Sequence, residues 1–228
     1  MVDRAIAQAT DRVALVAGAT GLVGQEILAA LLTDKRYAAV HCVGRRSATL
    51  KHPKLFSHVV DFTAPATLPA IGAIDDVFIA LGTTIKVAGS RAAFRSIDFD
   101  AVLAVALAAK AQGATKIGVV SAMGATPSSS VFYSRIKGEM EQAVSQLGYQ
   151  SLVIARPSML AGDREALAQA ARPTEKIGLI AMQLLRPLIP ANYRAIEARK
   201  VARILIQTLQ ATDQGTRIVL SGEMQSAN

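Results

Sequence analysis

A turn with three glycines is the feature that most constrains how this chain folds. Residues 18–24 read G-A-T-G-L-V-G, follow a short apolar run at Val13–Val16, and open a segment with helical apolar spacing over Leu22–Leu32. Glycines let a chain turn tightly and bring backbone N–H groups against a phosphate at the positive end of a helix. The residues expected to hold a pyrophosphate there are Gly18, Thr20, Gly21, Leu22, Val23 and Gly24.

The glycine spacing is G-x-x-G-x-x-G, which differs from the G-x-G-x-x-G of typical dehydrogenases. A glycine-rich turn between a strand and a helix, without any ligand, is therefore the alternative interpretation. Because strand, turn and helix coincide in the order that a dinucleotide site requires, the sequence favours the nucleotide.

Short apolar runs alternate with helical patterns along the whole chain, which predicts a doubly wound parallel α/β sheet of the Rossmann type, with about seven strands. The expected strands are Val13–Val16, Ala39–Val43, Val59–Val60, Val77–Ala80, Ile117–Val120, Leu152–Ala155 and Ile218–Leu220. The expected helices are Leu22–Leu32, Arg91–Gln112, Tyr133–Leu147, Ile177–Leu188 and Ala195–Gln210.

The length of 228 residues suits one domain, residues 1–228, in which residues 157–215 are expected to form a small substrate-side lobe. The chain is 51% hydrophobic, yet no apolar run reaches the ~18 to 20 residues that cross a bilayer, so no membrane span is expected. The single cysteine, Cys42, cannot form an internal disulfide, and no signal segment precedes Val13. Both observations favour a cytoplasmic protein.

A basic stretch lies where a cofactor phosphate would bind. Between Lys35 and Lys54 there are six Lys or Arg and no acid, within a chain of net charge +8. The second predicted strand ends in this stretch at Arg45 and Arg46, where NAD enzymes carry an acid for the ribose 2′-hydroxyl and NADP enzymes an arginine for the 2′-phosphate. Two guanidiniums without an acid predict NADP(H), against the alternative of two solvated surface arginines.

Further residues at the ends of predicted strands add to the nucleotide site. Asp61 follows the third strand and would accept a hydrogen bond from the adenine amino group. Leu81, Gly82 and Thr83 close the fourth strand, where small residues let the backbone pass close to the nucleotide. Each signal is weak alone, and their order along the chain supports them jointly.

A tyrosine and a lysine four residues apart suggest acid–base chemistry. Tyr133 and Lys137 share one face of a predicted helix, and an ammonium beside a phenol favours the phenolate. The tyrosine then serves as an acid or base near neutral pH, while Ser121, ending the fifth strand, would hold a substrate carbonyl oxygen. The alternative for Y-x-x-x-K alone is an aromatic at the core edge beside a solvated lysine.

These motifs together resemble the short-chain dehydrogenase/reductase superfamily in its atypical branch. Four further segments, 81–84 (L-G-T-T), 120–125 (V-S-A-M-G-A), 137–139 (K-G-E) and 155–157 (A-R-P), are similar to the Tat-interacting-protein-like NAD(P)H-binding oxidoreductases and their bacterial relatives. The likeness covers about residues 12–220.

The resemblance implies NADP(H) under the glycine turn and a trio of Ser121, Tyr133 and Lys137. In that trio the tyrosine moves a proton, the lysine grips the nicotinamide ribose and lowers the tyrosine pKa, and the serine orients substrate. Arg156 would border the nicotinamide. Typical members add an asparagine on the preceding helix, but the only asparagines here are residues 192 and 228, so Asp98 or Ser96 is at best a different substitute.

Two functions follow as hypotheses. The first is an NADP(H)-dependent oxidoreductase acting on an unidentified carbonyl or enone. The second is an NADP(H)-binding regulatory or redox-sensing protein with little or no turnover. Nucleic-acid binding is not expected because no aromatics are interleaved with the basic residues. No metal site is expected, since the histidines at 41, 52 and 58 lack partners at ligand spacing. A homo-oligomer is compatible with the sequence.

Overall fold

The computed structural model describes residues 11–62, 69–161 and 190–226. Within these ranges one sheet contains seven strands in the order β3-β2-β1-β4-β5-β6-β9, and every neighbouring pair is parallel. Its strands are β1 (Arg12–Ala17), β2 (Tyr37–Gly44), β3 (Leu55–Val59), β4 (Asp76–Ile79), β5 (Lys116–Val120), β6 (Ser151–Arg156) and β9 (Gly215–Leu220). The predicted doubly wound sheet is confirmed.

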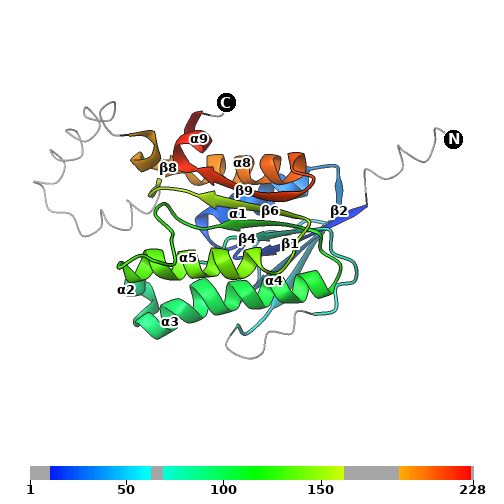
Figure 1. Ribbon diagram of the computed structural model, residues 1–228. Coiled ribbons are helices and arrows are strands. Elements are labelled where there is room, and N and C mark those ends of the chain that lie inside the picture. Colours follow the sequence, from blue (N-terminus) through cyan, green and yellow to red (C-terminus); the bar gives the residue numbers. More distant parts are fainter. Residues whose placement is uncertain (1–10, 63–68, 162–189, 227–228) are drawn as a thin grey trace, which may run out of the picture.

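Helices cover both faces of this sheet (Figure 1). The helices α1 and α8 lie over one face, and α4 and α5 lie over the other. The helical segments are α1 (Leu22–Thr33), α2 (Ile85–Ala88), α3 (Arg91–Arg95), the π-helical turn η2 (Ser96–Asp100), α4 (Ala101–Ala111), α5 (Phe132–Ser145), the 3₁₀ turn η4 (Ala191–Tyr193), α8 (Ala198–Ala211) and α9 (Ser221–Ser226). A separate pair of short strands joins β7 (Leu160–Ala161) to β8 (Ile196–Glu197).

The central strands form because their side chains are apolar on both faces. Every side chain of β4 is buried, as are four of the six in β1, and apart from Asp76 at the start of β4 these buried residues are apolar, which is typical of parallel strands covered by helices on both sides. Parallel strands end at one edge of the sheet, so the segments that follow β1, β2, β4 and β5 meet there. That edge holds the candidate site.

The structure differs from the sequence prediction at several elements. The third strand is Leu55–Val59 instead of Val59–Val60, because this edge strand exposes Phe56 and Val59 and lacks an apolar run. The single helix expected over Arg91–Gln112 is instead α3, the π turn and α4. The short elements α2, α9, β7 and β8 were not predicted. The helix expected at Ile177–Leu188 lies outside the described residues, as does much of the expected 157–215 lobe.

At the end of the sheet where the strands begin, opposite the candidate site, a buried polar network connects β1, β2 and β4. Arg12 donates two hydrogen bonds to Asp76, of 3.0 and 2.6 Å, and the Tyr37 hydroxyl donates a third of 2.6 Å to the same carboxylate. Asp76 is 2% exposed. Its charge is therefore balanced by an arginine and solvated by a phenol, far along the strands from the candidate site.

Candidate nucleotide-binding and catalytic site

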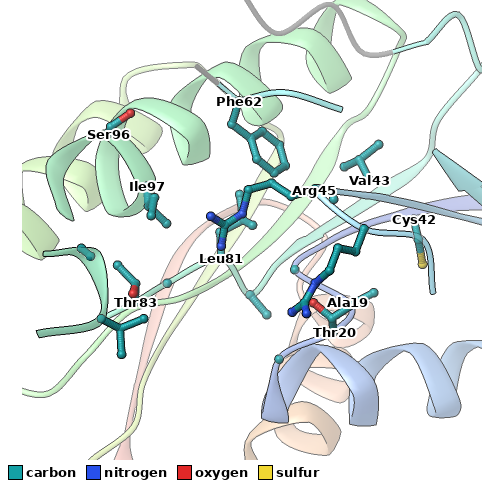
Figure 2. A pocket seen from close by; sticks show the side chains of 18 of the residues that line it. Ala19, Thr20, Cys42, Val43, Arg45, Phe62, Leu81, Thr83, Ser96 and Ile97 are labelled. Carbon is teal, nitrogen blue, oxygen red and sulfur yellow. The ribbon is translucent and has the colours of Figure 1, made fainter. Parts of the chain in front are cut away.

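A cavity of about 570 Å³ opens where β1, β2 and β4 end. Figure 2 shows Arg45 between the turn residues Ala19 and Thr20 on one side and Phe62 on the other, with Thr83, Ser96 and Ile97 at the far end from Cys42. Much of the predicted nucleotide site therefore lines one cavity. The predicted residues that line it are Gly18, Thr20, Gly21, Arg45, Arg46, Asp61, Leu81, Gly82 and Thr83.

Two glycines of the turn are required by packing within the chain, and the third faces the cavity. A β-carbon on Gly18, whose φ is +88°, would lie 2.5 Å from the Ala80 carbonyl oxygen, and one on Gly24 would lie 2.0 Å from the Gly18 oxygen. Packing within the chain therefore requires both. A β-carbon on Gly21 would meet only the Gly18 oxygen, at an ordinary 3.5 Å. Gly21 lines the cavity, so the space left by its missing side chain is open to a ligand in the cavity.

Helix α1 begins at this turn without a side-chain cap. Gly21 occupies the capping position, no side chain accepts a hydrogen bond from the first turn, and that turn contains no acid. The first N–H groups of a helix have no partner within it, and together with the helix dipole they attract an anion. The cavity wall at Gly18–Gly21 is therefore suited to a pyrophosphate.

Arg45 and Arg46 supply positive charge to the cavity. Both are exposed, both line the cavity, and neither forms an ion pair with an acid in the described part of the chain. Asp61 and Phe62 follow β3 on the neighbouring wall. An acid for a ribose 2′-hydroxyl does not occupy the end of β2, where the chain continues from Gly44 directly into the two arginines.

A buried ion pair lies directly behind the cavity wall. The Nζ atom of Lys137 lies 2.7 Å from Oδ1 of Asp98, and the two side chains are 5% and 0% exposed. The other carboxylate oxygen accepts a 2.9 Å hydrogen bond from the backbone N–H of Thr83. A β-carbon on Gly82 would lie 3.4 Å from Oδ1 and 3.6 Å from Nζ, so the pair lies close to the backbone that lines the cavity.

Burial and the lysine act on Asp98 in opposite directions. Burial raises the pKa of the Asp98 carboxyl, while the charge and hydrogen bond of Lys137 and the N–H of Thr83 lower it, with a net rise. The π turn carries this residue: the N–H of Ala101 donates to the Ser96 carbonyl, five residues back. Such turns widen a helix by one residue and are frequent at functional sites.

Tyr133 lies one turn before Lys137 on α5. Its ring is half-buried, and its centroid lies 5.4 Å from that of Phe94 in α3. Ser121 follows β5 and is 5% exposed, and its Oγ has no hydrogen-bond partner in the described ranges. A buried hydroxyl without a partner costs free energy, which suits a position where a ligand oxygen completes the bond.

The remaining predicted site residues lie outside the cavity wall. Leu22 and Val23 form the first turn of α1, with Leu22 42% exposed and Val23 buried. The guanidinium of Arg156 donates to both carboxylate oxygens of Glu141, at 3.0 and 2.5 Å. Neither Arg156 nor the trio of Ser121, Tyr133 and Lys137 lines the 570 Å³ cavity. The Lys137 ammonium comes close to the cavity at Gly82, which is a lining residue.

Sequence reasoning missed a whole wall of the cavity. From the α2–η2 segment the missed lining residues are Val87, Ala88, Ala93 and Ile97, and Cys42 and Phe62 were also missed, while Ser96 was named only as a substitute for the helix asparagine. Small apolar side chains carry no chemical signature, so no signal pointed to them. Asp98 was named only as a substitute for the helix asparagine, although its position carries a further signal: it lies at four-residue spacing from the buried Phe94 and Val102 and is thus an acid on an apolar stripe.

The described ranges contain no cluster of three or more His, Cys, Asp or Glu that would hold a metal ion. Among the helices in those ranges, none has the length and hydropathy to span a membrane. His41 and His58 contact each other, with ring nitrogens 2.9 Å apart, on the β2–β3 edge of the sheet.

Comparison with known proteins identifies the kind of site. A protein family described as NAD(P)H-binding matches residues 18–212. The chain is 31% identical to Protein HTATIP2 of Rattus norvegicus over 91% of this chain and 85% of that protein. It is 30% identical to Protein FMP52, mitochondrial, of Coccidioides immitis over 88% of this chain and 87% of that protein.

A solved structure shares the fold. It is a short chain dehydrogenase family protein from Francisella tularensis, with a TM-score of 0.69 and 15% identity over 94% of this chain and 99% of that chain. At this identity the likeness concerns the fold alone, which confirms the predicted Rossmann-type architecture. The resemblance to the atypical short-chain dehydrogenase/reductases is likewise confirmed by the family match and the HTATIP2 similarity.

The expected cytoplasmic location is contradicted by the names of these relatives. The fungal relatives, at 30–36% identity, carry the word mitochondrial in their names. The physical reason for the error is that Cys42 is a buried, unpaired thiol, which would persist in any compartment that does not oxidise it. One such cysteine does not distinguish between compartments.

Proposed function

The chain belongs to the NAD(P)H-binding oxidoreductases of the atypical short-chain dehydrogenase/reductase type, and on that premise we propose that it is an NADP(H)-dependent oxidoreductase acting on a carbonyl or enone. The single observation that carries the proposal is the 2.9 Å hydrogen bond from the Thr83 N–H on the cavity wall to Asp98, the buried partner of the Lys137 ammonium, because it joins the nucleotide cavity to the acid–base residues.

The preference for NADP(H) is supported by Arg45 and Arg46. Both guanidiniums line the cavity at the end of β2, and no acid occupies that position. A guanidinium binds an anionic phosphate through two parallel hydrogen bonds between opposite charges, whereas a neutral ribose hydroxyl at the same place gains less from the charge. Bound there, the cofactor would supply a hydride, and the chain supplies the binding surface and the proton.

The chain's own chemistry is proposed to lie in Ser121, Tyr133 and Lys137. The Ser121 hydroxyl holds the substrate oxygen, because its Oγ is buried without a partner in the described residues. Tyr133 donates the proton to that oxygen as it gains charge. Lys137, one helical turn later on α5, makes the phenol a stronger acid and grips the nicotinamide ribose.

A second candidate is an NADP(H)-binding regulatory protein with little turnover. It is favoured by one observation: Asp98 neutralises the Lys137 ammonium, which weakens the effect of that charge on Tyr133. Both candidates share the nucleotide site and differ only in whether a substrate is converted.

Titration with NADPH and NADH tests the nucleotide preference. We expect NADPH to bind tighter by about tenfold or more, the scale of one or two hydrogen bonds to a charged group. The double variant Arg45→Ala, Arg46→Ala should remove most of that difference. The matched control is Lys35→Ala, Lys51→Ala, which removes two exposed charges from the same basic stretch outside the cavity lining. Equal affinities of the parent for both nucleotides would refute NADP(H) preference.

Tyr133→Phe separates the oxidoreductase from the regulatory protein. The substitution removes one oxygen and leaves the ring contact with Phe94 in place. With NADPH and a panel of carbonyl compounds, an oxidoreductase loses turnover by about 10² or more while nucleotide affinity stays near the parental value. A regulatory protein converts no compound of the panel. Turnover that survives the substitution unchanged would show that Tyr133 is not the proton donor.

A further inference from the structure

We infer that Asp98 is a positioning residue that fixes the ammonium of Lys137 beside Gly82 and so prepares the lysine for the nicotinamide ribose. This inference rests on the proposed function, since it assigns a role to Asp98 through Lys137. Typical members have an asparagine on the helix that precedes the trio. This chain has no asparagine there, and the inference gives Asp98 a role in its place.

The two carboxylate oxygens of Asp98 have separate partners. Oδ1 lies 2.7 Å from the Lys137 Nζ atom, and Oδ2 accepts from the Thr83 N–H at 2.9 Å. Because Thr83 is part of the cavity wall, one carboxylate ties the lysine to that wall. With both oxygens engaged, the carboxylate cannot rotate without losing one contact, and the ammonium is held at a defined place.

Burial makes this attachment strong. Asp98 is fully buried and the Lys137 side chain is 5% exposed, so little water competes for either charge. An ion pair in such surroundings is held far more firmly than one at a surface, and removing one partner leaves the other charge buried and unpaired. The lysine therefore has one stable position in the chain, next to the backbone of Gly82.

The π turn determines where Asp98 points. Ser96 and Ile97 of this turn line the cavity, while Asp98, the next residue, is buried against α5. Contacts between the π turn and α5 bring the carboxylate to Lys137 from a different element of the chain. The same short turn therefore contributes both to the cavity wall and to the support of the lysine behind it.

A pair of probes that differ only in the nicotinamide half tests this role. NADPH contains the nicotinamide ribose, and adenosine 2′,5′-bisphosphate lacks it. For Asp98→Asn we expect NADPH affinity to fall by about tenfold or more, while the bisphosphate affinity stays within about twofold. Lys137→Met should show the same selective loss, and the double variant should lose little more than either single variant, because both act through the same contact.

Two further variants separate positioning from stability. Asp76→Asn removes a buried carboxylate with a basic partner at the opposite end of the sheet, so it should lower Tm and leave both affinities unchanged. Asp98→Glu retains the charge and lengthens the side chain by one methylene, and it carries the test if Asp98→Asn does not fold. Positioning predicts a selective loss of NADPH affinity in Asp98→Glu as well.

The outcomes distinguish this inference from the proposed function. If the parent binds NADPH no tighter than the bisphosphate, the proposed grip of Lys137 on the ribose fails, and the role of Asp98 fails with it. If the parent prefers NADPH and the folded Asp98 variants retain that preference, only the role of Asp98 is overturned. Equal losses for both probes would likewise overturn it, since they would indicate general damage to the cavity.

Discussion

A β-carbon on Gly24 would lie 2.0 Å from the carbonyl oxygen of Gly18, a separation at which the two atoms overlap. The close packing of the first turn of helix α1 against the Gly18 carbonyl therefore requires glycine at this position. We expect Gly24→Ala to lower the free energy of unfolding by about 2 kcal/mol or more, as overpacking against backbone does. Urea denaturation measures this loss. Gly21→Ala is the matched control, with an expected change within about 1 kcal/mol, and equal losses would contradict the packing argument.

Substitution of Gly21 should lower nucleotide affinity and leave the free energy of unfolding nearly unchanged. Gly21→Val places a branched side chain at the cavity wall, where no described atom other than the Gly18 oxygen lies within 4 Å of the β-carbon. We expect nucleotide affinity to fall by about 10² or more because the side chain occupies the place of the pyrophosphate. Calorimetric titration with NADPH measures it. An affinity equal to that of the parent would mean that the pyrophosphate binds elsewhere.

Two tyrosines allow a comparison of charged and neutral acceptors. The Tyr37 hydroxyl donates to the Asp76 carboxylate, and the Tyr149 hydroxyl donates to the Ala106 carbonyl, each at 2.6 Å. Tyr37→Phe should cost about 2 kcal/mol of unfolding free energy and Tyr149→Phe about 1 kcal/mol, since bonds to charged groups contribute more. Denaturant titration of both variants tests this order, and a larger loss in Tyr149→Phe would reverse it.

Cys42 reports on the same cavity through its thiol. The side chain is buried and lines the cavity, and burial raises the pKa of the Cys42 thiol to about 12. The thiolate is the reactive form, so at pH 8 iodoacetamide should alkylate the folded chain about 10³-fold more slowly than the chain in urea. The rate should rise about tenfold per pH unit over the range below that pKa, because the thiolate fraction does. Equal rates for folded and unfolded chain would show that β2 opens readily.

The sequence predicted best those elements whose burial is uniform. The strands β1, β4, β5 and β6 are apolar because helices cover both of their faces, and their positions were expected within a few residues. The edge strand β3 was misplaced because it pairs on one side only and exposes Phe56 and Val59, so no apolar run marks it. Short elements such as α2 depend on local caps, including the Thr84 side chain and a left-handed Gly89, and escape a periodicity argument.

For the candidate site, the sequence predicted part of the cavity lining, while Arg156 and the trio of Ser121, Tyr133 and Lys137 lie outside it and their roles stay predictions. The glycine turn, the arginine pair and the strand-end residues line one cavity, as expected from the shared edge of parallel strands. It could not predict which apolar side chains, such as Val87 and Ile97, would complete the wall. It also named Asp98 without a partner, because the ion pair with Lys137 joins residues 39 positions apart.

The π turn makes this part of the chain sensitive to length as well as to chemistry. An α-helix rotates by about 100° per residue, so deleting one residue between Ser96 and Asp100 would restore regular helical hydrogen bonds and turn one side of the segment by that angle. Either Asp98 would then leave Lys137, or Val102 and Val105 of α4 would leave the core. A one-residue deletion here is thus expected to disrupt the core or the Asp98–Lys137 pair, whereas many single substitutions on the exposed side of the same turn should leave both intact.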